Sequence, residues 1–337
     1  MAVLLRRRSL LSAGLLTVLT ACGGTTGHSG ASATAVDPDT AARRRVGTAM
    51  TALVTGYENS REETPDLQRL LVAELTAVDP GAARAAGAPG TTGAAKAMAT
   101  ASAAASAQAT IGASPSARAS ASATSASAAP VGNAVLAARE SALATLCATE
   151  LLAVSPALAR LLASVSAGAA QRAVVLGAQA PAASDPTSAS APTRPSAAEL
   201  SSLQAALGAE DAAVYGYGVI GAQLSGSDRG LASTDFDLHR AHRDALSARI
   251  TAAGARPQAA AAAYLLPFDV TDAGSARRLA TLLETRLAAV YANGVQAATG
   301  APRSEAATEL RAAALRSLSW GGTPTAFPGL PDPASSA

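Results

Sequence analysis

Residues 200–224, LSSLQAALGAEDAAVYGYGVIGAQL, carry large apolar side chains at alternating spacings of three and four. Side chains spaced in this way lie on one face of an α-helix. Glu210 falls in the middle of the apolar stripe. Because a buried carboxylate is costly unless a partner compensates its charge, this stretch predicts a long helix that carries one acidic side chain into a core with a partner for it.

The same periodicity predicts four helices before this one and three after it. The leading stripes lie within residues 46–57, 67–78, 136–154 and 158–176, and the later helices span about 233–253, 274–293 and 304–320. Helices of this length with apolar stripes are typical of bundles. We therefore expect an all-α protein.

The connection between the second and third helices of the C-terminal half is unusually long. It has about 20 residues and contains Pro257 and Pro267. Ferritin-like folds are four-helix bundles with one long crossover. The C-terminal half is therefore predicted to be a ferritin-like four-helix bundle, and the leading helices are expected either to form a second bundle or to pack onto the first.

The N-terminus has the pattern of a bacterial lipoprotein signal. The basic residues 6–8 precede an apolar stretch, 10–19, which is too short to span a bilayer, and small residues precede Cys22. The pattern resembles a lipobox, which implies cleavage before Cys22 and diacylation of that cysteine. We therefore expect an exported protein whose lipid anchor holds it on the outer face of the cytoplasmic membrane, in the cell envelope. The segment fits both twin-arginine export and general secretion.

Low-complexity segments divide the rest of the chain. The expected order is a signal peptide at 1–21, a tether at 22–39, a helical region at 40–177 with an insert at 87–130, a linker at 178–196, a helical bundle at 197–320 and a tail at 321–337. The tether, insert, linker and tail have few large apolar side chains to offset the entropy of ordering. We expect them to be disordered.

Composition excludes several classes of protein. Of the 337 residues, 49% are hydrophobic but only 3% are aromatic, and alanine, leucine and valine dominate, which argues against an all-β fold. The net charge of +2 falls to −1 when residues 1–21 are removed, so no electrostatic footprint for nucleic acid remains. Acylation of Cys22 would leave Cys147 alone, and we expect it to be a small buried residue.

The predicted helix 233–253 carries two histidines. Asp235, His239 and His242 lie on its apolar stripe, and Glu284 lies at the edge of the stripe of the next helix. Together with Glu210 they would gather carboxylate and imidazole ligands at mid-height in the bundle. Such a set suits one iron, manganese or zinc ion.

Short motifs are distributed over residues 199–331. They are Glu210-Asp211-Ala212-Ala213-Val214-Tyr215-Gly216-Tyr217-Gly218, the segment 239–244, Leu266-Pro267-Phe268-Asp269-Val270-Thr271-Asp272, Glu284 and Ala326-Phe327-Pro328-Gly329. This region resembles the ferritin-like domain of unknown function found in actinobacterial lipoproteins. The resemblance implies a closed helical bundle and a cell-envelope location, and it implies no activity.

The sequence departs from the ligand pattern of di-iron bundles. Those use a glutamate from each of two helices and Glu-x-x-His from each of the other two. Here the second helix offers His239-x-x-His242, and the periodicity places Glu305, Glu309 and Arg316 of the last helix on its polar face. A dinuclear centre is therefore not expected. In the alternative interpretation Glu210 pairs with His242 or with Arg243, which would fix the helix register without binding a ligand.

Two functional hypotheses remain open. In the first, the protein is a non-catalytic envelope protein that binds a small ligand or a protein partner, with Glu210, His239, His242 and Glu284 as a buried polar network. In the second, it is a mononuclear metal storage or sensing protein, with Glu210, His242 and Glu284 as ligands and with Asp235 and His239 in support. The sequence has no nucleophile elbow and no phosphate-binding loop, and an enzymatic activity is not expected.

Overall fold

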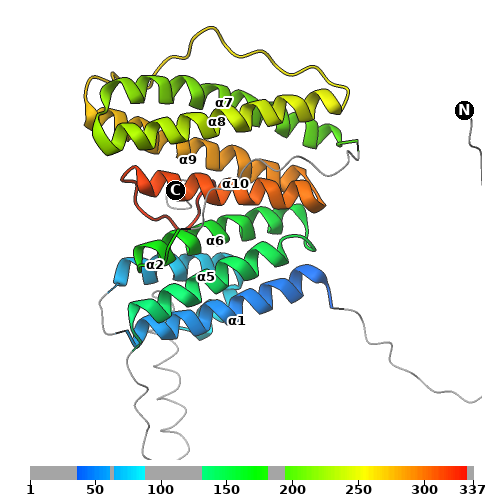
Figure 1. Cartoon of the computed structure of the whole chain (residues 1–337). Coiled ribbons are helices and arrows are strands. Elements are labelled where there is room, and N and C mark those ends of the chain that lie inside the picture. Colours follow the sequence, from blue (N-terminus) through cyan, green and yellow to red (C-terminus); the bar gives the residue numbers. More distant parts are fainter. Residues whose placement is uncertain (1–35, 61–63, 88–130, 181–193, 332–337) are drawn as a thin grey trace, which may run out of the picture. The chain divides into compact units, whose positions relative to one another are not determined.

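The computed structural model describes residues 36–60, 64–87, 131–180 and 194–331 (Figure 1). Its helices are α1 (Pro38–Glu58), α2 (Pro65–Val78), α3 (Pro80–Ala85), α5 (Asn133–Glu150), α6 (Pro156–Val175), α7 (Ala197–Gln223), α8 (Gly226–Ala252), α9 (Ala273–Ala297) and α10 (Gly300–Ser319). The predicted all-α class is confirmed. The helix α8 begins at Gly226, earlier than predicted. Its first turn is polar and largely exposed, so no apolar stripe in the sequence indicates where the helix begins.

Several predictions concern parts of the chain outside the described residues. These are the signal peptide 1–21, Cys22 with nearly all of the tether, nearly all of the insert 87–130, and most of the linker. Among the helices that are described, none has the length and hydropathy needed to cross a membrane. Cys147 is described; it is free and has no exposed surface, as expected for a small buried residue.

Local chemistry fixes where several helices begin. The side chains of Asp37, Ser155 and Ser196 each accept a hydrogen bond from a backbone N–H in the first turn of α1, α6 and α7. At the start of α9, Asp272 and Ser275 form a reciprocal capping box. These caps fix the first turns of α1, α6, α7 and α9.

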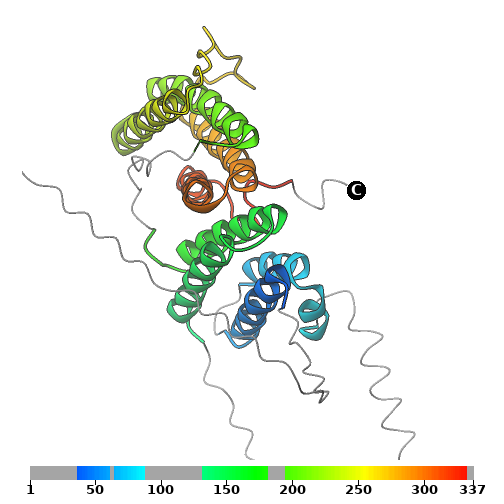
Figure 2. The ribbon, with the colours of Figure 1, turned by 90° about the vertical axis from the view of Figure 1, so that its right-hand side faces the viewer.

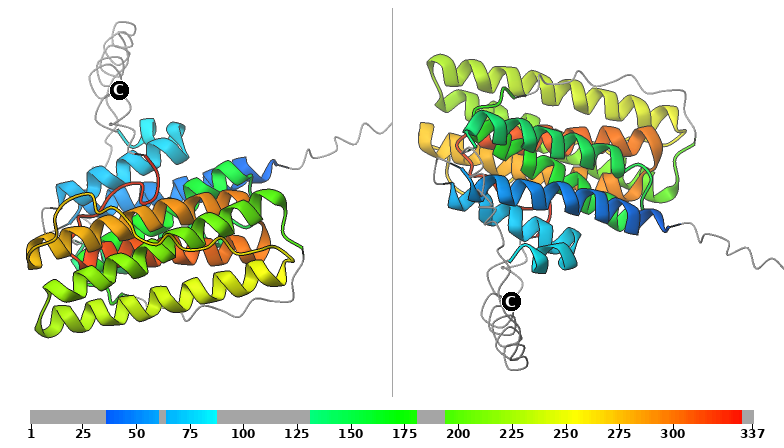
Figure 3. Two further views of the ribbon diagram at one scale, coloured as in Figure 1. Left: turned by 90° about the horizontal axis from the view of Figure 1, so that it is seen from above. Right: turned by 90° about the horizontal axis from the view of Figure 1, so that it is seen from below.

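The helices α7–α10 form the C-terminal bundle. α7 packs against α8 and α9, and α9 packs against α10. The long connection between α8 and α9 follows the outside of this bundle (Figure 3). It is held along α7, where the Gln204 side chain bonds the Arg256 carbonyl at 2.8 Å and the Gln258 amide at 2.9 Å, and where the rings of Tyr215 and Tyr264 lie 5.4 Å apart.

The leading helices pack onto this bundle through α6. α6 contacts both α9 and α10 on one side and α2 and α5 on the other (Figure 2). A single cluster of buried apolar side chains runs through both halves; it includes Leu71 of α2, Leu162 of α6, Leu279 of α9 and Leu310 of α10. Residues 37–331 therefore share a core in their described parts.

The expectation of disorder is wrong for residues 321–331 of the C-terminal tail. The Ser164 hydroxyl of α6 donates to the Pro328 carbonyl at 2.8 Å, and the Thr325 amide donates to the Gln171 side chain at 3.1 Å. Gly329 has a φ of 77°, and a Cβ there would lie 2.5 Å from the Ala288 carbonyl oxygen of α9. Hydrogen bonds and a close backbone approach thus order a segment that has few large apolar side chains of its own.

Candidate functional site

The centre of the C-terminal bundle is an imidazole held between two carboxylates. His239 of α8 bonds Glu210 of α7 through Nδ1 at 2.7 Å and Glu284 of α9 through Nε2 at 3.0 Å, and none of the three side chains is exposed. Since both carboxylates are acceptors, both ring nitrogens act as donors, which is the imidazolium form. Burial lowers the pKa of His239, but the bonds to Glu210 and Glu284 outweigh it and raise that pKa to about 9.

The fourth helix supplies the second cation. Arg316 of α10 donates through Nε to Glu284 Oε2 at 2.9 Å. Burial favours the neutral form of Glu210, but its hydrogen bond to His239 and the nearby imidazole of His242 lower its pKa to about 2. Burial likewise opposes ionisation of Glu284, and the charge of Arg316 with the His239 bond nonetheless lowers its pKa. Two carboxylates and two cations therefore form a neutral group at the centre.

Aromatic side chains complete the hydrogen bonding of this group. The Tyr217 hydroxyl donates to Glu284 Oε1 at 2.6 Å, and the Tyr291 hydroxyl makes a short hydrogen bond to Glu210 Oε1. The Trp320 indole N–H donates to Asp235 at 2.8 Å. Burial is the first cause that raises the pKa of Asp235.

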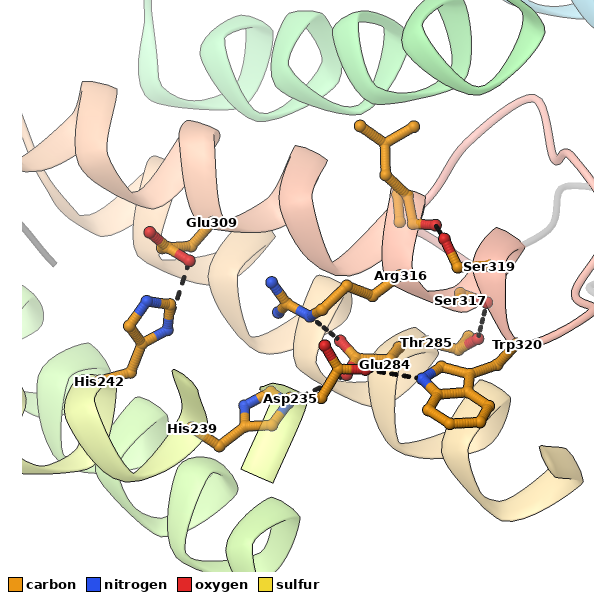
Figure 4. Close-up of polar contacts among 12 residues, drawn as sticks. Asp235, His239, His242, Glu284, Thr285, Glu309, Arg316, Ser317, Ser319 and Trp320 are labelled. Atoms are coloured by element: carbon orange, nitrogen blue, oxygen red, sulfur yellow. Dashed lines mark hydrogen bonds and ion pairs between the residues drawn. The ribbon is translucent and has the colours of Figure 1, made fainter. Parts of the chain in front are cut away.

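The predicted site residues are all buried, but the structure does not place them in one group (Figure 4). It brings Glu210, His239 and Glu284 together. His242 lies beside them, with Nδ1 3.6 Å from Glu210 Oε1, and Asp235 is bonded instead by Trp320. Arg243, the alternative partner of Glu210, forms its ion pair with Asp244 at 2.7 Å.

The prediction that Glu309 and Arg316 lie on a polar outer face is wrong. Arg316 reaches Glu284 in the core, and Glu309 Oε2 lies 3.4 Å from His242 Nδ1. The apolar stripe with Leu310 and Ala314 is buried as expected. α10 packs against both α9 and α6, so residues beside its apolar stripe also face other helices. The long side chains of Glu309 and Arg316 reach His242 of α8 and Glu284 of α9.

Most of the predicted metal ligands are hydrogen-bonded to other side chains. In the described ranges, no group of three or more His, Cys, Asp or Glu side chains is placed to hold a metal ion. Both nitrogens of His239 already bond carboxylates, and both oxygens of Glu284 bond donors. The positive charge that a metal would bring is supplied by His239 and Arg316. The residues of this central group do not fit a metal, and ligation by the wider predicted set stays a prediction.

A groove lies between α8 and α10, next to this group. Its volume is about 570 Å³, within the range of small-molecule sites. α7 and α9 form its floor, and most of its lining is apolar, including Leu203, Leu246 and Val290. At one end, Arg249 of α8 bonds Glu305 of α10 at 2.7 Å and Glu199 of α7 at 3.1 Å.

The other end of the groove is polar and incompletely bonded. His242, only 4% exposed, and Glu309 line it. Within the part of the chain that the structure describes, neither ring nitrogen of His242 has a hydrogen-bond partner, and neither does Glu309 Oε2. Buried polar atoms are usually hydrogen-bonded, so these three buried atoms are candidates to bond a guest that enters this end of the groove.

Sequence comparison assigns this bundle to a family. The family described as domain of unknown function (DUF4439) matches residues 202–332. The C-terminal region of the chain is a DUF4439 domain. A crystal structure of a conserved hypothetical protein, rv2844, from Mycobacterium tuberculosis is 33% identical to this chain; the match covers 36% of this chain and 94% of that one, with a TM-score of 0.36. A comparison with curated proteins found no match.

The predicted resemblance is therefore confirmed for the domain of unknown function. Neither the description of the family nor the name of the mycobacterial protein states an activity or a ligand. The ferritin-like assignment and the lipid anchor stay predictions.

The leading helices, outside the DUF4439 domain, contain a second buried ionic cluster that the sequence analysis missed. Arg172 of α6 bonds Glu74 of α2 through two hydrogen bonds of 2.8 Å, and its Nε bonds Glu140 of α5 at 2.8 Å. The Tyr57 hydroxyl donates to Glu140 at 2.8 Å. Burial raises the pKa of Glu74 to about 8, although the charge and hydrogen bonds of Arg172 oppose this.

The two clusters share a sequence spacing. Glu140 precedes Arg172 by 32 residues, and Glu284 precedes Arg316 by 32 residues. In both hairpins the arginine helix ends at a glycine with positive φ, Gly177 at 97° or Gly321 at 94°. This repeated spacing in the sequence is the signal that could have placed Arg316 in the core of the DUF4439 domain.

We expect the stability of the protein to fall as the pH rises from 6.5 to about 9. The His239 pKa is 6.5 in the unfolded chain and about 9 in the folded one, so its contribution is complete below pH 6.5 and is lost as pH rises through the folded value. The unfolding free energy should fall by up to about 1.4 kcal/mol per pH unit in this interval. Urea unfolding at several pH values measures it. His239→Gln should flatten the profile, and parallel profiles for the two proteins would contradict the assignment.

The cluster around Arg172 should behave as a structural element. Arg172→Met leaves Glu74 and Glu140 buried without a cation, and we expect a loss of about 3–5 kcal/mol in unfolding free energy. Combining it with Glu74→Gln and Glu140→Gln should restore part of the loss, because the buried acids are then removed. Chemical denaturation compares the variants. If the Arg172→Met protein is as stable as the parent, the cluster does not hold these helices together.

Proposed function

We propose that the protein is a cell-envelope lipoprotein, anchored to the membrane through Cys22, whose DUF4439 domain binds a small ligand without chemically transforming it. The single observation that carries the proposal is the groove between α8 and α10, with His242 and Glu309 at its inner end, where three of their polar atoms have no hydrogen-bond partner. A concave, mainly apolar site with a few convergent polar groups is the usual form of a ligand site.

A comparison of the two ionic clusters supports this assignment. The Arg172 cluster uses one tyrosine, two glutamates and one arginine, and the four nitrogen–oxygen contacts of the guanidinium are 2.8–3.1 Å. The DUF4439 domain has the corresponding tyrosine, glutamate and arginine in Tyr217, Glu284 and Arg316. His242 and Glu309 have no counterpart in the Arg172 cluster. Because the tyrosine, glutamate and arginine bond one another without them, we explain their burial by contact with a ligand.

The groove predicts saturable binding of an apolar probe. The neutral dye N-phenyl-1-naphthylamine should bind mature protein carrying Cys22→Ser and gain fluorescence. Ala245→Trp places an indole in the groove lining and should weaken dye binding at least tenfold, whereas Ala241→Trp, at an exposed position of the same helix, should not. Equal binding by both variants would place the dye elsewhere and remove the support for a ligand groove.

A second candidate, a mononuclear iron, manganese or zinc protein, is favoured by the position of His242, whose Nδ1 lies 3.6 Å from Glu210 and 3.4 Å from Glu309. Metal analysis by mass spectrometry separates the two candidates. Under our proposal the purified protein contains far less than one equivalent of metal, and Glu210→Ala and His242→Ala do not change the amount. Near-stoichiometric metal that both variants abolish would instead establish the metal protein.

A further inference from the structure

The charges along the groove between α8 and α10 are unequal. Its ionisable lining includes three acids, Glu199, Glu305 and Glu309, but only one arginine, Arg249. Arg249 is shared between Glu199 and Glu305, so the outer end retains one negative charge. A groove with excess negative charge and low-dielectric walls favours a cationic guest and disfavours an anionic one.

The inner end shows the same imbalance. The cations nearest to it, His239 and Arg316, are matched by Glu210 and Glu284. Glu309 Oε2 has no hydrogen-bond partner in the described chain, and burial raises the pKa of its carboxyl group although His242 and Arg316 oppose this. Compensation of this charge is what a bound cation would provide.

The hydrogen-bonding groups at the inner end fit an ammonium. A primary ammonium has three N–H donors and no acceptor. Among the described residues, Glu309 Oε2 is an acceptor without a hydrogen-bond partner, and both ring nitrogens of His242 are likewise without one. The two side chains lie 3.4 Å apart at their closest nitrogen and oxygen, so one nitrogen of a ligand can bond both.

The side chains between the two ends of the groove indicate the chemistry of the rest of the ligand. They are lined by small and aliphatic side chains, namely Leu203, Ala206, Ala245, Leu246, Val290 and Ala306. Such walls offer few hydrogen bonds to a polar ligand. Burying the methylene groups of an alkyl chain against them favours binding by about 0.8 kcal/mol for each group. A divalent metal ion would leave this apolar length unused.

We propose that the groove binds a primary amine that carries an alkyl chain, with the ammonium between Glu309 and His242 and the chain along the apolar walls towards Arg249. This inference rests on the proposed ligand-binding function and names the chemical class of its ligand. It follows from the unmatched acids, the unpartnered acceptors and the aliphatic lining of one continuous groove.

Three probes with the same chain length test the head group. Titration calorimetry of the mature protein with n-octylamine, 1-octanol and octanoate, each below its aggregation concentration, should give the tightest binding for octylamine. We expect its dissociation constant to be at least tenfold below that of octanol, and octanoate to bind weakest. Butylamine should bind at least tenfold more weakly than octylamine, because it leaves most of the walls uncovered.

Matched variants locate the ammonium. Glu309→Gln should weaken octylamine binding at least tenfold and change octanol binding much less, because only the amine loses a charge partner, whereas Glu305→Gln, at the outer end, should change octylamine binding less than threefold. Glu309→Gln removes an unmatched buried acid, so folding should be kept, and circular dichroism checks it. Glu309→Asp keeps the charge and should retain more octylamine affinity than Glu309→Gln.

The outcomes separate this inference from the function on which it rests. Equal binding of octylamine and octanol, or an octylamine affinity that Glu309→Gln does not change, would overturn the amine assignment. Dye binding that is sensitive to Ala245→Trp would still support a ligand groove in that case. If the dye and all three eight-carbon probes fail to bind, both the amine assignment and the proposed function are wrong.

Discussion

The DUF4439 domain depends on one buried interaction, the imidazolium of His239 between Glu210 and Glu284. With Arg316 it contains one charged side chain from each of the four helices of the bundle. A shift of any helix by one turn would move a charge away from its partner and among leucines, where an unpaired charge costs several kcal/mol. The charged group therefore fixes the register of helices whose alanine-rich surfaces would otherwise permit several packings.

The leading helices use the same device in simpler form. Tyr57, Glu140 and Arg172 repeat the arrangement of Tyr217, Glu284 and Arg316, with Glu74 as the additional acid. The two clusters thus share a tyrosine, a glutamate and an arginine. The cluster of the DUF4439 domain also has His242 and Glu309 beside it, and these two residues line the groove.

Periodicity predicted the elements and part of the site, and tertiary packing decided the rest. Glu210 was identified because a single acid interrupts a stripe of leucines, and His239 because it shares the stripe of its helix. Glu309 and Arg316 were misplaced because periodicity assigns a Cα position, whereas a long side chain places its charge several ångströms away. The order of residues 321–331 could not be predicted from composition, since it comes from bonds to Ser164 and Gln171 on a distant helix.

The groove exists because α8 and α10 do not pack directly against each other. Their backbones make few or no close contacts, whereas α7 packs on α8 and α9 packs on α10. Polar pairs span the gap at both ends, Arg249 with Glu305 and His242 with Glu309. The first pair has complementary charges and is satisfied, while the second leaves polar atoms without partners. Protein interiors are usually close-packed, so this open groove with one incompletely bonded polar end is the feature on which the proposed ligand binding rests.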